Sequence, residues 1–247
     1  MQQKNRIPEP VTEQMPATNY LPGRRNFLAK LTGAAALTAV AAACNKETNF
    51  GNGANLLSAN DQRLAAGKAI SMGEGDIAVL NYAYLLEQLE ATFYTMVVSN
   101  FFSGISNYNR MRFMQIRDHE IAHREFFKNA LSTMAIPEIE FDFSMVDFSS
   151  RDSVVTYSKT FEDTGVAAYN GAGKYLKNPD YLLAAGKIVS VEARHASFLR
   201  SLDAPTSFAA NDVVDMNGLD VAKSPLQIVK IVAPFIKTPM DFSKLPG

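Results

Sequence analysis

The chain has little of several things that would otherwise suggest a function. A single cysteine among 247 residues excludes an intramolecular disulfide and a four-cysteine zinc site. The 24 Lys and Arg against 25 Asp and Glu give a formal charge of −1, so the basic excess of a nucleic-acid-binding protein is missing and no nucleic-acid partner is expected. Only three histidines are present. Apolar residues, in contrast, make up 47% of the chain, which excludes general disorder and suffices for a sizeable core.

Residues 1–44 are predicted to be an export signal that is not part of the fold. Arg24 and Arg25 precede a Phe-Leu pair and the apolar stretch 31–43. That stretch is shorter than the roughly 20 residues that a membrane-spanning helix needs, and its length suits a signal peptide. The arrangement resembles a bacterial twin-arginine signal. We therefore expect an exported protein of the periplasm or cell envelope.

The only cysteine, Cys44, directly follows the apolar stretch and resembles the lipidated cysteine of bacterial lipoproteins. Lipoprotein signals usually carry leucine three positions earlier, where this chain has Ala41. The alternative is an ordinary small-residue cleavage site with an incidental cysteine, but the position of the cysteine favours lipidation and membrane anchoring. Residues 45–73, rich in Asn, Gly, Ser and Ala, are predicted to be a linker.

Four long segments with apolar residues at helical spacing follow the linker. They are predicted to be helices at 76–100, 106–134, 150–176 and 178–202. Short connections make antiparallel hairpins of helices one and two and of helices three and four, whereas the connection 137–149 is long enough to cross the bundle from end to end. The predicted fold class is all-α, a four-helix bundle over residues 74–202 with a long crossover between helices two and three. Residues 203–247 form a C-terminal extension, with a short apolar helix near 225–236 expected on the outside of the bundle.

Two Glu-x-x-His motifs are the strongest functional signal. Glu120 and His123 lie on the second predicted helix, and Glu192 and His195 lie on the fourth. A spacing of three places the carboxylate and the imidazole one turn apart on one helix face. The neighbouring residues on both faces are apolar, and buried carboxylates are costly unless they are paired or bind a metal. The motifs therefore favour a metal site inside the bundle.

An internal repeat supplies further carboxylates from the other two helices. Three residues of the first helix match three residues of the third at one constant offset: Tyr82, Glu87 and Tyr94 correspond to Tyr157, Glu162 and Tyr169. Each hairpin thus carries Glu followed by Glu-x-x-His. Glu90 lies one turn from Glu87 and is the alternative ligand on the first helix. We favour Glu87 because it is the repeat partner of Glu162.

This set, one Glu from each of two helices and Glu-x-x-His from each of the other two, resembles the ligands of ferritin-like di-iron and di-manganese proteins. The resemblance covers about residues 70–202, and it is to the secreted bacterial branch related to desiccation-associated proteins. It implies a site for two divalent metal ions, iron or manganese, whose charge the four carboxylates would balance. It does not specify the reaction, because several oxidoreductase activities share this fold and site.

Other residues near the motifs have less specific interpretations. Tyr94 and Tyr169 lie two turns from Glu87 and Glu162 on the same faces, where each is either a core tyrosine or a hydrogen-bond donor to a ligand. His119 is expected to face away from His123, on the surface or around the site. Three glycines of the third helix are expected to permit close packing: Gly165, Gly171 and Gly173.

Two classes of function follow from these observations. One is a metalloprotein with oxidoreductase chemistry on oxygen, peroxide or ferrous iron. The other is a non-catalytic envelope protein that uses the bundle for binding or stress protection. Binding of metal would fit both, so whether the protein is an enzyme stays open. A homo-oligomer is compatible with the sequence, but a lipid-anchored or linker-bearing chain would hinder a closed ferritin cage.

Overall fold

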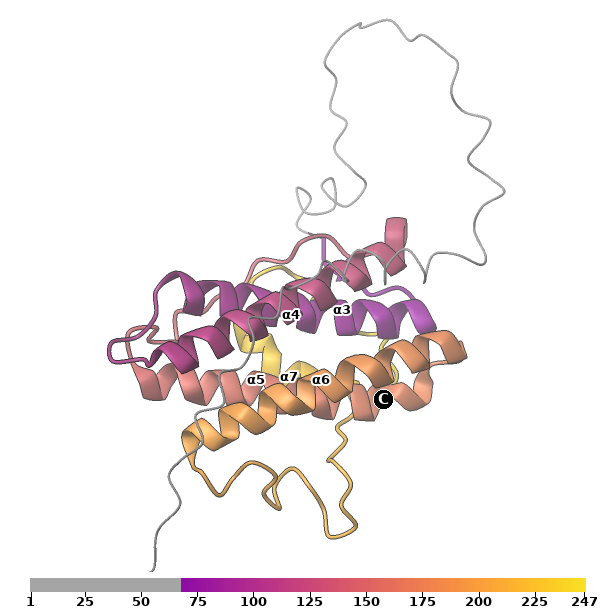
Figure 1. Cartoon of the computed structure of the whole chain (residues 1–247). Helices are drawn as coiled ribbons and strands as arrows, with labels where there is room; N and C mark the ends of the chain where they lie inside the picture. Colours follow the sequence, from indigo (N-terminus) through magenta and orange to yellow (C-terminus); the bar gives the residue numbers. More distant parts are fainter. Residues whose placement is uncertain (1–67) are drawn as a thin grey trace, which may run out of the picture. The chain divides into compact units, whose positions relative to one another are not determined.

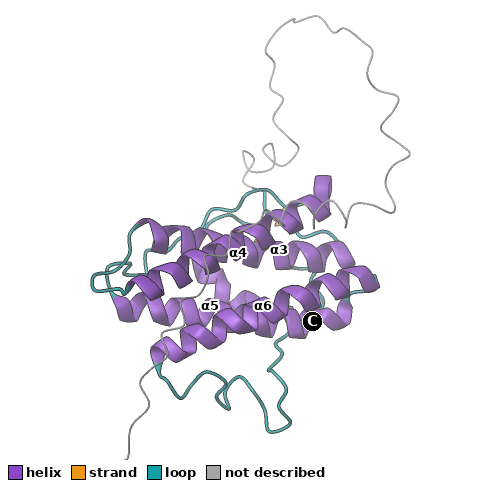
Figure 2. Ribbon diagram, viewed as in Figure 1, coloured by secondary structure: helices purple, strands orange, loops and turns teal. Residues whose placement is uncertain are grey.

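Helices make up most of the described part of the chain, residues 68–247 of the computed structural model. The described residues form the strands and helices β1 (Ile70–Ser71), α3 (Asp76–Ser99), α4 (Asn107–Leu131), α5 (Arg151–Ala172), α6 (Pro179–Asp203), α7 (Pro225–Val232) and β2 (Met240–Asp241), and three 3-10 turns at Ser132–Met134, Gly173–Tyr175 and Ala233–Phe235. Figures 1 and 2 show the four long helices side by side. The predicted all-α four-helix bundle is therefore confirmed.

Three of the four long helices follow a residue whose side chain caps the helix. Ser106 and Ser150 cap α4 and α5, and their hydroxyls accept hydrogen bonds from backbone N–H groups three residues on. Asn178 caps α6, with proline in the first helical position. Asp76, the first residue of α3, accepts hydrogen bonds from the backbone N–H groups of Lys177 and Asn178, both at 2.9 Å. This carboxylate joins the start of one hairpin to the turn of the other.

The long connection between α4 and α5 runs along the outer face of α3, as the predicted crossover requires. Two buried amide side chains of α3 hold its backbone. Asn81 donates to the carbonyl of Met134 at 2.9 Å and accepts from the N–H of Ile136 at 2.9 Å. Gln88 accepts from the N–H of Ile139 at 2.9 Å. Because the crossover covers the face of α3 that points away from the other helices, α3 is buried almost all round.

The core between α3 and α5 contains a cluster of aromatic residues. Phe93 of α3 packs edge to face on Phe161 of α5, with ring centroids 5.0 Å apart. Phe235, which follows α7, packs on Phe161 at 4.9 Å and on Tyr157 at 5.8 Å. The predicted short helix is thus present at the outside of the bundle, against α5. Aromatic pairs of this geometry add to the stabilisation that burial alone provides.

Both ends of the described chain pack against the bundle. β1 pairs in parallel with β2, in the register Ile70 to Met240 and Ser71 to Asp241. Ile70 and Met72, which the sequence placed at the end of the linker, are buried in the core. The expectations for residues 1–67, including the export signal, Cys44 and most of the linker, lie outside the described residues.

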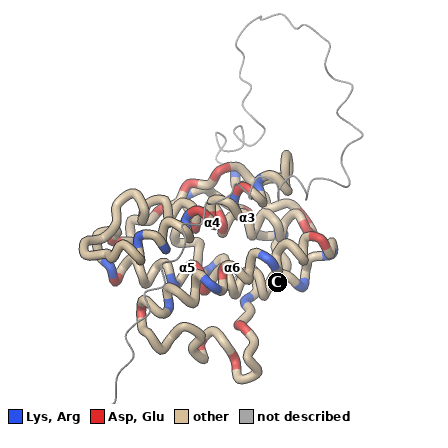
Figure 3. The backbone as a smooth tube through the Cα atoms, viewed as in Figure 1, with Lys and Arg blue, Asp and Glu red and all other residues tan. Residues whose placement is uncertain are grey.

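Acidic and basic residues are interspersed along the described helices and loops in Figure 3. Within this described part, none of the helices combines the length and apolar character needed to cross a membrane.

Candidate metal centre

Six side chains from four helices meet in the middle of the bundle. Glu87 comes from α3 and Glu162 from α5, while α4 and α6 contribute the two Glu-x-x-His pairs. All four glutamates are completely buried. Residues three apart differ by about 300° around a helix and by about 4.5 Å along it, so each pair presents both of its side chains to the interior.

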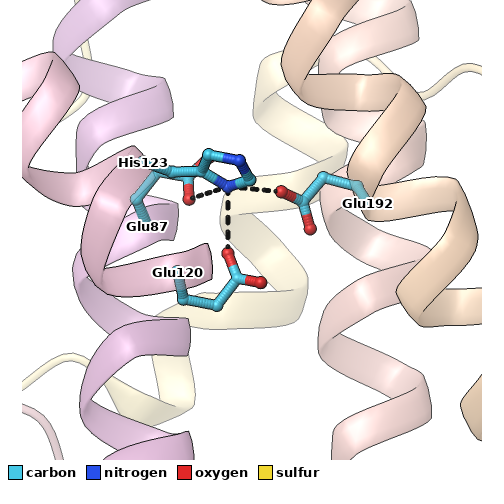
Figure 4. Close-up of side chains that lie close together, drawn as sticks. All are labelled: Glu87, Glu120, His123 and Glu192. Carbon is cyan, nitrogen blue, oxygen red and sulfur yellow. Dashed lines mark hydrogen bonds and ion pairs between the residues drawn. The ribbon is translucent and has the colours of Figure 1, made fainter. Parts of the chain in front are cut away.

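The first group of ligand atoms surrounds the imidazole of His123 (Figure 4). Its Nδ1 lies 2.8 Å from Oε1 of Glu192, 3.3 Å from Oε2 of Glu120 and 3.4 Å from Oε2 of Glu87. These three carboxylates come from three different helices. The His123 side chain is 13% exposed, so this group lies just inside the surface of the bundle.

The second group surrounds His195 in the same manner. Its Nδ1 lies 2.8 Å from Oε1 of Glu120, 3.3 Å from Oε2 of Glu162 and 3.5 Å from Oε2 of Glu192. Glu120 and Glu192 therefore belong to both groups, and we call them the shared carboxylates. Glu87 and Glu162 each belong to one group, and we call them the private carboxylates.

The arrangement fits a metal ion better than a set of ion pairs. Within each group the candidate ligand atoms all lie within 4.8 Å of one another. Opposite ligands on an octahedral ion are about 4.2 Å apart when the bonds are about 2.1 Å long. Several of the buried atoms lack a well-directed hydrogen bond among the described residues, although imidazole nitrogens lie near some of them: Glu87 Oε2, Glu120 Oε1, both oxygens of Glu162 and of Glu192, and His195 Nδ1. Buried polar atoms without partners are costly, and a cation between them would satisfy them.

Burial and the histidines act in opposite directions on the acidity of the cluster. Burial raises the pKa of Glu87 to about 8 and raises that of Glu162 well above its usual range. Burial also acts to raise the pKa of Glu192, but its contacts with both imidazoles lower it overall. Burial lowers the pKa of His123 and His195, and the surrounding carboxylates more than reverse this, so both end well above their usual range. Without a metal, protons therefore balance part of the negative charge.

Glu90 lies beside this cluster and belongs to neither group of ligand atoms. Its side chain is almost completely buried, at 3% exposed. It faces Gly165 of α5, where an added Cβ would lie 3.1 Å from Oε1 of Glu90. Burial, followed by the charge of Glu162, raises the pKa of Glu90 well above its usual range. Of the two alternatives on α3, the structure places Glu87 among the ligand atoms and Glu90 next to them.

The two tyrosines cross over between the halves of the repeat. Tyr169 of α5 donates a hydrogen bond to Oε1 of Glu87 on α3. Tyr94 of α3 interacts with Glu162 of α5, although its hydroxyl lacks a well-directed hydrogen bond among the described residues. Burial is the main cause that raises the pKa of both phenols, so they stay protonated as donors. The structure thus places each tyrosine against the private carboxylate of the opposite hairpin.

His119 lies around the site, which is one of the two places that the sequence allowed. Its ring stacks on that of His195 with centroids 5.1 Å apart, and its Nδ1 lies 2.9 Å from Nε2 of His195. The expectation that it faces away from His123 is wrong. Residues four apart on a helix differ by only about 40° in direction, so the spacing already placed His119 and His123 on one face. This spacing could have identified His119 as a neighbour of the site from the sequence alone.

Together, the bundle and the cluster define a helical protein with a buried carboxylate and histidine site that can hold metal. Comparison with protein families agrees, since the model of the ferritin-like domain matches residues 75–204. The chain therefore belongs to the ferritin-like domain family. Comparison with curated proteins gives no match.

Proposed function

We propose that this protein binds two divalent ions, iron or manganese, at the centre of its bundle. The observation that carries the proposal is the overlap of the two ligand groups through the shared carboxylates Glu120 and Glu192. A carboxylate has two oxygens and can serve two neighbouring ions at once. One imidazole and one private carboxylate remain for each ion.

The charge and type of the ligands support this composition. Four carboxylates carry about −4, which two divalent cations would neutralise. Mixed carboxylate and imidazole ligands suit iron and manganese better than they suit copper or the zinc of thiolate-rich sites. Both histidines direct Nδ1 towards the carboxylates, which makes this nitrogen the ligand atom.

The bound ions would supply redox chemistry on oxygen, peroxide or ferrous iron, and the protein would control their surroundings. Tyr169 orients Glu87 through its hydrogen bond. His119 holds the ring of His195 from outside, so that its Nδ1 points inward. Phe113 and Phe127 are buried on the same helix, on either side of the Glu-x-x-His motif.

Metal analysis is the decisive first test. Protein purified without chelator is expected to contain close to two equivalents of iron or manganese, and an E192Q variant to contain far less. E125Q is the matched control, because Glu125 lies on the exposed side of α4 in an ion pair with Arg124. The proposal would be contradicted if wild-type protein, supplied with two equivalents of iron or of manganese per chain, bound neither metal.

Turnover separates an enzyme from a binding protein. The loaded protein should consume peroxide or oxidise ferrous iron faster than the same concentration of free metal, and E192Q should not. Full metal occupancy without either activity would favour the non-catalytic alternative, a binding or stress-protection protein of the envelope.

We also propose that the chain is exported and anchored by a lipid at Cys44. The Arg24-Arg25 pair, the short apolar stretch and the position of the only cysteine support this. Replacing both arginines with lysine should block export, and Cys44→Ser should release exported protein from the membrane fraction. Export that persists in the first variant would contradict a twin-arginine signal, and membrane association that persists in the second would contradict the anchor.

A further inference from the structure

The two hairpins of the bundle differ at one buried position next to the metal ligands. Glu87 and Glu162 correspond in the repeat at a separation of 75 residues. At the same separation, Glu90 corresponds to Gly165. One hairpin therefore carries an additional buried carboxylate three residues after its private carboxylate, and the other carries no side chain at that position.

The glycine makes the space that the additional carboxylate occupies. A Cβ at Gly165 would lie 3.1 Å from Oε1 of Glu90, a contact tighter than side chains normally make. Gly165 is three residues after Glu162 on α5 and shares its face, so the Glu90 carboxylate crosses to the opposite hairpin and lies beside Glu162. The Glu90 side chain is only 3% exposed.

A second difference falls on the same half of the site. His119 contacts Nε2 of His195, which leaves Nδ1 of that ring directed at the carboxylates. The residue of α6 that corresponds to His119, at the separation of 72 that relates the two Glu-x-x-His motifs, is Val191. A valine offers no hydrogen bond to His123. The Glu90 carboxylate and the contact from His119 therefore both support the group of ligand atoms that contains Glu162 and His195.

We infer that Glu90 is an additional carboxylate for the ion held by Glu162 and His195, and that it makes this the tighter of two unequal metal positions. The inference rests on the proposed dinuclear centre. With a metal ion bound, a buried carboxylate next to Glu162 would add negative charge to that position, while the position of Glu87 and His123 has no equivalent. Gly165 is the residue that permits the asymmetry.

Manganese titration of the metal-free full-length chain tests the inference. Calorimetry, together with the electron paramagnetic resonance signal of free Mn²⁺, should resolve two binding steps in the wild type. E90Q should weaken the tighter step by about 10–100-fold, the usual cost of losing a supporting group at a metal site, and leave the weaker step unchanged. E162Q should affect the same step as E90Q, and E87Q should affect the other.

Matched variants separate the position of Glu90 from its charge and from folding. E125Q makes the same chemical change on an exposed helix face and should leave both steps unchanged. G165A keeps Glu90 but crowds its Oε1, and should weaken the tighter step by less than E90Q does. E90Q keeps the shape of the side chain and places no charge at this buried position, so its metal-free form should melt no lower than the wild type.

The outcomes distinguish the two proposals. If the wild type binds two ions but E90Q gives the isotherm of E125Q, Glu90 is a packing residue and only this inference is overturned. The same follows if E90Q weakens the step that E87Q removes, or weakens both steps equally. If the wild type binds fewer than two manganese ions, the dinuclear centre fails and the inference fails with it.

Discussion

Replacing a shared carboxylate should cost more metal-dependent stability than replacing a private one. Glu192 lies within 3.5 Å of the Nδ1 atoms of both histidines, so in the proposed dinuclear centre E192Q would remove a ligand from both positions. Glu87 contacts only His123 among the histidines, so E87Q affects one position. The two variants make the same chemical change in equally buried side chains.

The expected magnitudes follow from mass action. An ion present at 100 times its dissociation constant stabilises the folded state by about 2.7 kcal/mol, so two independent ions would add about 5.4 kcal/mol. In a domain of this size 1 kcal/mol corresponds to about 2–4 °C, which gives a metal-dependent rise in melting temperature of about 11–22 °C in the wild type. E87Q should keep about half of that rise, and E192Q should keep little of it.

Thermal unfolding of metal-stripped protein, with and without Mn²⁺ at one fixed concentration, measures this difference. The rise on adding metal is the relevant quantity, because E192Q also removes the partner of two protonated histidines and should lower the melting temperature of the metal-free protein. Equal rises in E87Q and E192Q would show that Glu192 is not shared. If neither manganese nor iron changed the melting temperature of the wild type, the metal centre itself would be refuted.

Two further predictions concern pH and packing. Because the pKa of Glu87 is raised to about 8 and those of His123 and His195 are raised further, these groups hold protons in the metal-free protein and must release them on binding. Metal affinity should therefore rise with pH, and the melting temperature of the metal-free protein should fall as the pH rises from about 5 towards 8. Calorimetry in two buffers of different ionisation enthalpy should detect the released protons, and no dependence on buffer would contradict the shifts. Gly171→Ala should destabilise the fold by about 1–3 kcal/mol, because its Cβ would lie 1.8 Å from the carbonyl oxygen of Lys223. Gly186→Ala, in open space on α6, should instead stabilise it by about 0.5–1 kcal/mol, and urea unfolding that ranks the two variants otherwise would contradict the packing argument.

Local patterns in the sequence were sufficient to predict the bundle. Helical spacing of apolar residues, cap residues such as Ser106 and Ser150, and the unequal connections predicted four helices, their hairpins and the crossover. The predicted boundaries agree with the observed ones to within one residue, except at the C-terminal ends of α4 and α5, where a 3-10 turn replaces the last turn of the predicted helix. The two Glu-x-x-His motifs were also visible, because a metal pair on one helix face is a local feature.

What the sequence left open concerns residues that meet across helices. The choice between Glu87 and Glu90 depended on which carboxylate faces α4 and α6. The two residues are about one turn apart on nearly the same face of α3, so their spacing does not show which of them does. The stacking of His119 on His195, and the hydrogen bond from Tyr169 to Glu87, each join residues more than 70 positions apart. Such contacts depend on how packed helices are rotated and shifted along their axes relative to one another. The local spacing of apolar residues carries no information about either.

The sequence by itself therefore determined the secondary structure, the fold class and the candidate ligand types of this protein. Only the tertiary structure decided that Glu120 and Glu192 are shared between two groups and that Gly165 admits Glu90 beside Glu162. The physical reason is that helix formation follows from contacts within a few residues, whereas a buried site is created by the packing of four helices. In such a site, the space available to each side chain is set by residues that are distant in the sequence.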